Sequence, residues 1–169
     1  MLALMLAATV SVAAQDSPGV ATATPRQWRT PAGLDAAVTG LPASYSSSVE
    51  LLTIGTSLEG RPIRAIRLAL AGDVPVDDRS AVLLVAGIDG DHLLGSEVAV
   101  EIASSLLARA GDGDENVVSL LRDHALHIVP QVNPDGAARY FDVVRSGHRE
   151  NMRSDDADRD GAVDEDGGD

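Results

Sequence analysis

Residues 81–97 read AVLLVAGIDGDHLLGSE, and this stretch decides both the fold class and the place of the candidate site. It begins with a continuous apolar run, Ala81 to Ala86, which is typical of a strand buried on both faces of a parallel or mixed sheet. A loop containing two glycines follows, and a helix is then expected from about Leu93 to Arg109. The expected helix is recognised by apolar residues at helical spacing, namely Leu94, Val98, Ile102 and Leu106.

Further strands and helices are expected before and after this stretch of sequence. Val49 to Thr56 and Pro62 to Leu70 read as strands joined by a turn that contains Gly60, which predicts a β-hairpin. Leu126 to Val132 reads as a further buried strand. Short helices are expected over residues 32–40, after Asp114 or Asn116 with Val117, Leu120 and Leu121 facing inward, and over Ala137 to Val144. The fold class is therefore α/β, with a mixed β-sheet flanked by helices.

The loop after the apolar run carries Asp89 and His92, three residues apart. Ligands of open α/β sheets bind outside the carboxyl ends of the strands, which is where this loop lies. Zinc accepts both imidazole nitrogen and carboxylate oxygen, so the pair is a candidate for two metal ligands. The alternative is structural: Asp89 caps a turn and His92 opens the next helix.

Composition and charge restrict the class of protein. The chain has 169 residues, 44% of them hydrophobic and only 2% aromatic, which suits one domain with an aliphatic core. The net charge is −13, and nine acidic residues against two arginines lie within residues 150–169. A nucleic-acid partner is not expected, because phosphate binding needs a basic face. Cysteine is absent, so no disulfide or thiolate site exists in this chain.

The first residues are typical of an export signal. Met1 to Ala14 is apolar and Ala-rich and ends in small residues suited to cleavage, although the usual positive charge is missing. The alternative of a transmembrane anchor needs about 20 apolar residues, more than this run has. We expect residues 1–14 to be a signal peptide, residues 15–31 to be a linker, and the protein to be secreted or periplasmic.

Two further motifs flank the Asp89–His92 loop in the chain. Residues 55–63 read GTSLEGRPI, and residues 133–136 read NPDG at the end of an expected strand. Together with the strand and loop from Val82 to Glu97, they resemble the M14 zinc carboxypeptidases over residues 32–153. The resemblance implies a zinc-carboxypeptidase-like α/β/α sandwich, which is incomplete in this chain.

In that family the loop supplies a His-x-x-Glu pair of zinc ligands. The matching positions here are Asp89 and His92, so the pair keeps one carboxylate and one imidazole but exchanges their places. Glu97 matches a position outside the metal shell. The family's third zinc ligand, a histidine, and its general base, a glutamate, come further downstream and have no counterpart here. His124 and His127 are expected to be structural residues of a strand.

The resemblance also implies an arginine that stabilises the oxyanion of the scissile carbonyl. Arg149 matches this position best, and Arg145 and Arg153 are nearby alternatives. The competing interpretation is that these arginines are solvated surface residues.

Residues 154–169 form an acidic segment with a second candidate metal site. The pattern Asp-x-Asp-x-Asp-Gly resembles the start of a calcium loop, with candidate ligands Asp156, Asp158, Asp160 and Asp164. The glutamate expected at position twelve is Gly167, so the loop is incomplete. The alternative is a disordered acidic insert.

The resemblance predicts a zinc-dependent metallocarboxypeptidase that hydrolyses C-terminal peptide bonds of peptides or proteins, with this chain inactive by itself. One alternative is a non-catalytic secreted binding module of the same fold. Another is a related amidohydrolase acting on acyl-amino acids or peptidoglycan peptides. Neither a nucleic-acid partner nor a stable membrane span is expected.

Overall fold

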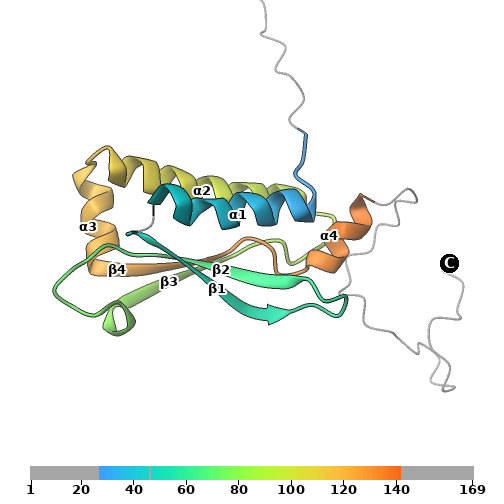
Figure 1. Ribbon diagram of the computed structural model, residues 1–169, viewed down its shortest axis with the longest axis horizontal. Coiled ribbons are helices and arrows are strands. Elements are labelled where there is room, and N and C mark those ends of the chain that lie inside the picture. Colours follow the sequence, from blue (N-terminus) through green and yellow to red (C-terminus); the bar gives the residue numbers. More distant parts are fainter. Residues whose placement is uncertain (1–26, 46, 142–169) are drawn as a thin grey trace, which may run out of the picture.

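The computed structural model describes residues 27–45 and 47–141 (Figure 1). A four-stranded sheet with the order β1-β2-β4-β3 forms its centre. Helices α1 and α2 lie side by side over one face of the sheet, and α3 and α4 lie toward its opposite ends. In chain order the elements are α1 (Pro31–Tyr45), β1 (Val49–Thr56), β2 (Pro62–Leu68), the 3-10 turn η1 (Val76–Asp78), β3 (Ser80–Val85), α2 (Leu93–Gly111), α3 (Glu115–Asp123), β4 (His124–Val129) and α4 (Pro134–Tyr140).

Strand pairing in the sheet is mixed, as the sequence predicts. β1 and β2 form the expected antiparallel hairpin, β2 pairs with β4 antiparallel, and β3 pairs with β4 parallel. The chain passes from β3 through α2 and α3 to β4, so the β3 and β4 strands point the same way. Their carboxyl ends therefore meet at one edge of the sheet. The loop with Asp89 and His92 and the turn with Asn133 both leave from this edge.

The core lies between the two long helices and the sheet, and it is aliphatic. Ile66, Leu68 and Ile128 come from the strands and are almost completely buried. Facing them are buried aliphatic side chains of the helices, including Leu34, Val38, Val100 and Leu107. The expectation of an aliphatic core is confirmed. None of the helices in the described part of the chain is long and apolar enough to cross a membrane.

The expected burial of the third strand on both faces is wrong. Within β3 the side chain of Leu83 is 66% exposed, and Val82, on the other face, is also exposed. β3 is an edge strand of the described sheet and pairs only with β4 there. Helix α2 packs over β2 and β4 rather than over β3. An apolar run thus identified the strand correctly, but its burial depends on which neighbours cover it.

Only part of the apolar stripe used to recognise α2 packs against the core: Ile102 and Leu106 do so and are partly buried. Leu94 is 60% exposed and Val98 is also exposed. The most buried face is offset from this stripe and contains Ala99, Ala103 and Leu107.

The other helices also differ in detail from expectation. In α3, Val117 and Leu121 face inward as expected, whereas Leu120 is exposed. α1 extends beyond the expected residue 40 to Tyr45, and α4 begins at Pro134, before the expected start. These differences from the expectation concern the ends of helices and the exposure of one side chain, and the fold class is the expected one.

Candidate active site

Three separate sequence motifs meet at the carboxyl ends of β3 and β4. The strand pairing continues past the strands, because the Ala86 N–H donates to the Val129 carbonyl at 2.9 Å and the Val132 N–H donates to the Ala86 carbonyl at 3.1 Å. The Asn133 N–H then donates to the Gly87 carbonyl at 2.9 Å. The backbone before Asp89 is therefore held against the chain that leads into the NPDG turn.

Asp135 of the NPDG turn joins this region to the β1–β2 hairpin. Asp135 is 1% exposed. It accepts hydrogen bonds from Ser57 Oγ at 2.7 Å, from the Glu59 N–H at 3.1 Å and from Arg61 Nη1 at 2.6 Å. Ser57 Oγ in turn accepts from the Arg61 N–H at 2.9 Å. The two motifs that flank the candidate loop in sequence thus form one polar cluster around a buried carboxylate, the Asp135 cluster.

The charge of Asp135 is favoured by its partners. Burial raises the pKa of the Asp135 carboxyl, but the hydrogen bonds from Ser57, Arg61 and the Glu59 N–H outweigh burial, so its pKa lies below its ordinary value. The pKa of Arg61 is raised, mainly by its hydrogen bond to Glu59 and then by the one to Asp135. Asp135 is therefore an ionised structural residue at neutral pH.

A glycine contact brings the candidate loop against the NPDG turn. A Cβ atom added at Gly90 would lie 2.3 Å from the Gly136 carbonyl carbon and 2.8 Å from the Ala137 nitrogen. Both are backbone atoms and cannot rotate away. Gly136 in turn donates its N–H to Asn133 Oδ1 at 2.9 Å, and this bond caps α4. Glycine at position 90 lets the loop lie directly on the first turn of α4.

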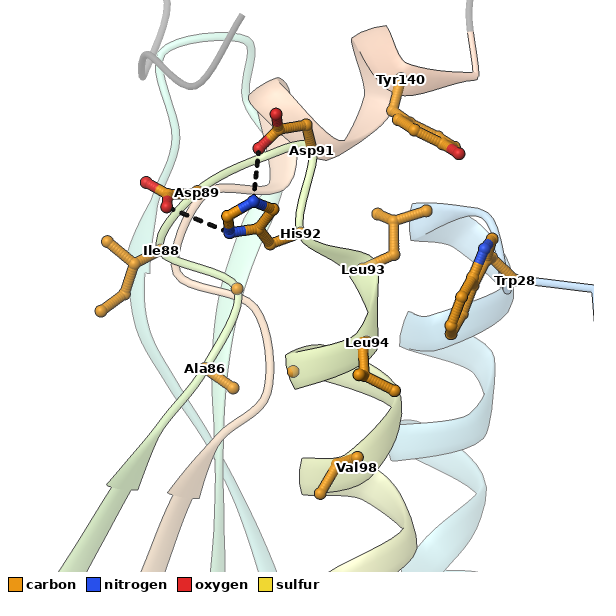
Figure 2. Close-up of a pocket in the computed structure, with 12 residues that line it drawn as sticks. Trp28, Ala86, Ile88, Asp89, Asp91, His92, Leu93, Leu94, Val98 and Tyr140 are labelled. Carbon is orange, nitrogen blue, oxygen red and sulfur yellow. Dashed lines mark ion pairs between the residues drawn. The ribbon is translucent and has the colours of Figure 1, made fainter. Parts of the chain in front are cut away.

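The side chains of Asp89 and His92 point toward each other (Figure 2). Asp89 Oδ2 lies 3.3 Å from His92 Nδ1, and the two side chains are 44% and 63% exposed. His92 is also the residue before the first turn of α2, as in the alternative interpretation, but its side chain makes no capping hydrogen bond. The imidazole is thus directed at Asp89. The structure brings these two predicted residues together.

Asp91, which the sequence reasoning did not single out, approaches the other side of the imidazole. Its Oδ1 lies 3.8 Å from His92 Nε2, so the ring lies between two carboxylates (Figure 2). An open depression of about 780 Å³ adjoins this group. Its apolar wall includes Trp28, Leu94 and Tyr140. The repeated aspartate in the Asp-Gly-Asp-His sequence was a local signal that could have identified Asp91.

Comparison with known proteins identifies the family. The family model described as zinc carboxypeptidase matches residues 34–164, which is most of the chain. The chain belongs to the M14 zinc carboxypeptidase family. The matched range includes the hairpin motif, the Asp89–His92 loop and the NPDG turn, and the family implies zinc as the metal.

Similar curated proteins include carboxypeptidase E of Caenorhabditis elegans, 33% identical over 51% of this chain and 18% of that protein. The inactive metallocarboxypeptidase ecm14 of Talaromyces marneffei is 31% identical over 62% of this chain and 18% of that protein. The chain therefore spans less than a fifth of the length of either M14 relative.

Solved structures support the same fold. Bovine thrombin-activatable fibrinolysis inhibitor, solved with a tick carboxypeptidase inhibitor, has a TM-score of 0.64 at 19% identity over 81% of this chain and 40% of that chain. The metallo-carboxypeptidase of Burkholderia cenocepacia has a TM-score of 0.51 at 27% identity over 62% of this chain and 27% of that chain. The expected zinc-carboxypeptidase-like fold is confirmed.

The distance between the two candidate donors agrees with tetrahedral zinc. Zinc binds nitrogen and oxygen ligands at about 2.0–2.2 Å, so two ligands of a tetrahedron lie about 3.3–3.5 Å apart. The observed 3.3 Å separation of Asp89 Oδ2 and His92 Nδ1 falls in this range. Within residues 27–45 and 47–141, no three His, Cys, Asp or Glu side chains are grouped to hold a metal ion. Asp89 and His92 therefore form a candidate pair of zinc ligands in the described part of the chain.

Glu97 makes a different interaction from the pair. It is buried, accepts from the Arg29 N–H at 2.8 Å and pairs with Arg29 Nη1 at 2.8 Å. This partly buried ion pair joins the segment before α1 to α2 and places Trp28 beside the depression. The interaction agrees with the expectation that Glu97 lies outside the metal shell.

The remaining predicted site residues fall in two groups. His124 and His127 both lie in β4, as expected for structural residues. The other candidates lie outside the described residues: Arg145, Arg149 and Arg153, and the calcium candidates Asp156, Asp158, Asp160 and Asp164. The calcium prediction receives no support from the family match, whose metal is zinc.

Proposed function

We propose that this chain is part of a zinc-dependent metallocarboxypeptidase that hydrolyses C-terminal peptide bonds, with Asp89 and His92 as two of its zinc ligands. The supporting observation is the 3.3 Å approach of Asp89 Oδ2 to His92 Nδ1 in a loop that resembles the first zinc-binding loop of the family. When bound, zinc supplies a Lewis acid that polarises a carbonyl and activates water. The chain by itself is expected to be inactive, because it matches only part of the family's ligand set.

Each residue of the group has a distinct task in this proposal. Asp89 contributes a negative charge and His92 a neutral imidazole, both suited to zinc. Asp91 Oδ1 lies 3.8 Å from His92 Nε2; in this proposal it moves within hydrogen-bond distance, accepts a hydrogen bond from the Nε2–H and so leaves Nδ1 as the donor to the metal. Arg149 is proposed to stabilise the negative charge that develops on the scissile carbonyl oxygen.

Zinc titration of the full chain tests the ligand assignment. We expect the variant Asp89→Ala/His92→Ala to lose zinc binding measured by isothermal titration calorimetry. A matched control is Asp77→Ala/His124→Ala, which removes the same two side-chain types from the η1 turn and from β4. The control should bind zinc as the unmodified chain does. Equal zinc affinity of both double variants and the unmodified chain would refute the assignment.

A second candidate function is a non-catalytic binding module of the same fold. The observation in its favour is the exchanged ligand pair, together with the 31% identity to a relative named an inactive metallocarboxypeptidase. The two functions differ in one assay, carried out on a longer protein that contains this chain. Release of the C-terminal amino acid from an N-terminally blocked peptide favours the enzyme, and peptide binding without release favours the module.

Substrate and location follow from the same proposal. The partner is a peptide or protein, and the apolar Met1–Ala14 run supports export to the periplasm or the medium. Calcium binding by Asp156 to Asp164 is expected to be weak at most, because Gly167 stands where the loop needs a bidentate glutamate. A calcium titration of the peptide 155–169 measures this directly.

A further inference from the structure

Gln131 lies between β4 and the NPDG turn, and its carboxamide makes three hydrogen bonds. Nε2 donates to the Gly87 carbonyl at 3.3 Å and to the Asn133 carbonyl at 3.1 Å. Oε1 accepts from Ser96 Oγ at 2.9 Å. One half-buried side chain therefore touches the candidate loop, the first turns of α2 and the NPDG segment.

The chemistry of these partners determines how the carboxamide is oriented. Carbonyl oxygens only accept hydrogen bonds, so the nitrogen of Gln131 must face Gly87 and Asn133. The oxygen is then left for the hydroxyl of Ser96. Glutamate lacks the two donors, and methionine lacks both donors and the strong acceptor, although both have a similar length.

The backbone conformation and the space around Gly87 both suit the hydrogen bond from Gln131. Its φ is +63°, a conformation that favours glycine. A Cβ atom at Gly87 would lie 2.6 Å from both Gln131 Nε2 and Ser96 Oγ. The backbone, the amide and the hydroxyl are therefore packed without room for another atom.

The residues that Gln131 contacts lie on both sides of the proposed metal pair, Asp89 and His92, in the sequence. Gly87 lies two residues before Asp89, and Ser96 lies four residues after His92. We propose that Gln131 is a positioning residue, which holds both ends of this loop so that Asp89 and His92 keep the separation that zinc requires. The metal part of this inference rests on the proposed function. The need for such support is clear, because both side chains of the pair are exposed and gain little rigidity from packing.

The test compares Gln131→Met and Gln131→Glu with Val117→Ala in the full chain. Val117 is buried in α3, toward the opposite end of the sheet from α4, so its truncation lowers stability without touching the loop (Figure 1). Two quantities are measured below the unfolding transition: amide hydrogen exchange of residues 88–92, and zinc affinity by calorimetry.

Both Gln131 variants should speed exchange of the loop amides about tenfold or more, because two or three hydrogen bonds are lost. They should also weaken zinc binding by about 10–100-fold, the usual effect of removing support from a metal ligand. Val117→Ala should change zinc affinity less than about twofold, since additivity holds for distant sites.

The two measurements separate this inference from the proposed function. If the unmodified chain binds no zinc, the ligand assignment fails, and loop exchange alone still decides whether Gln131 holds the loop. Loop exchange that is equal in Gln131→Met, Val117→Ala and the unmodified chain would overturn the positioning role. Faster loop exchange combined with unchanged zinc affinity in the Gln131 variants would overturn its link to the metal.

Discussion

Two polar groups lie at the same end of the sheet and differ in almost every physical respect. The Asp135 cluster has a buried carboxylate at its centre, which accepts hydrogen bonds from Ser57, Arg61 and the Glu59 N–H. The Asp89–His92 pair is exposed. The first joins segments more than 70 residues apart, whereas the second joins neighbours on one loop.

The difference separates residues that stabilise the fold from residues that we propose to bind the metal. Removing one partner of a buried ion pair leaves a charge without compensation and is strongly destabilising. An exposed pair contributes about 0–1 kcal/mol. The exposed pair can therefore be exchanged between Asp and His without unfolding the protein. The hairpin and NPDG motifs match the family pattern here, while the proposed metal pair departs from it by exchanging the carboxylate and the imidazole.

The largest effect is expected at the buried cluster. Asp135→Asn keeps the size of the side chain but removes its charge and places an amide nitrogen among three donors. We expect a loss of about 2–4 kcal/mol, toward the low side for a buried pair because Arg61 is 35% exposed and water can replace part of the contact. Urea denaturation measures this loss. A change below about 0.5 kcal/mol, the size of an ordinary surface substitution, would remove the distinction between the two groups.

A smaller effect is expected where the loop meets the NPDG turn. Gly90→Ala places a methyl group against the backbone of Gly136, which cannot yield, and overpacking of this kind costs about 1–3 kcal/mol. The control is Gly40→Ala in α1, where a Cβ atom meets nothing within 4 Å. That control should stabilise the helix by about 0.5–1 kcal/mol. If both variants changed the free energy of unfolding in the same direction, the close contact between Gly90 and Gly136 would be contradicted.

Lowering the pH should reduce the difference in the free energy of unfolding between the unmodified chain and Asp135→Asn. The pKa of Asp135 is depressed in the folded protein, because its hydrogen bonds outweigh burial, relative to about 3.9 in the unfolded chain. Its contribution is therefore complete above pH ~4 and is lost as pH falls through the folded pKa. Urea midpoints measured from pH 6 down to pH 2.5 should converge for the two proteins. Parallel pH curves would show that ionisation of Asp135 contributes nothing.

The sequence predicts local features of this molecule better than long-range ones. The β1–β2 hairpin and the proximity of Asp89 and His92 follow from spacing within a few residues, and the structure agrees. The exposure of Leu83 and Leu94 could not be predicted, because it depends on which elements pack above them. The same holds for the hydrogen bond between Ser57 and Asp135, whose partners are 78 residues apart. The family resemblance indicated the motifs, but only the structure shows their contact.

The smallest change in stability is expected for Asp89→Ala/His92→Ala measured without metal. Both side chains are exposed, and truncating exposed residues changes the free energy of unfolding by about 0.5 kcal/mol or less. Adding zinc should stabilise the unmodified chain, because a ligand that binds only the folded state raises its stability, and should leave the double variant unchanged. Thermal unfolding with zinc and with a chelator measures both effects. Strong destabilisation of the metal-free double variant would place the pair with the Asp135 cluster as part of the fold.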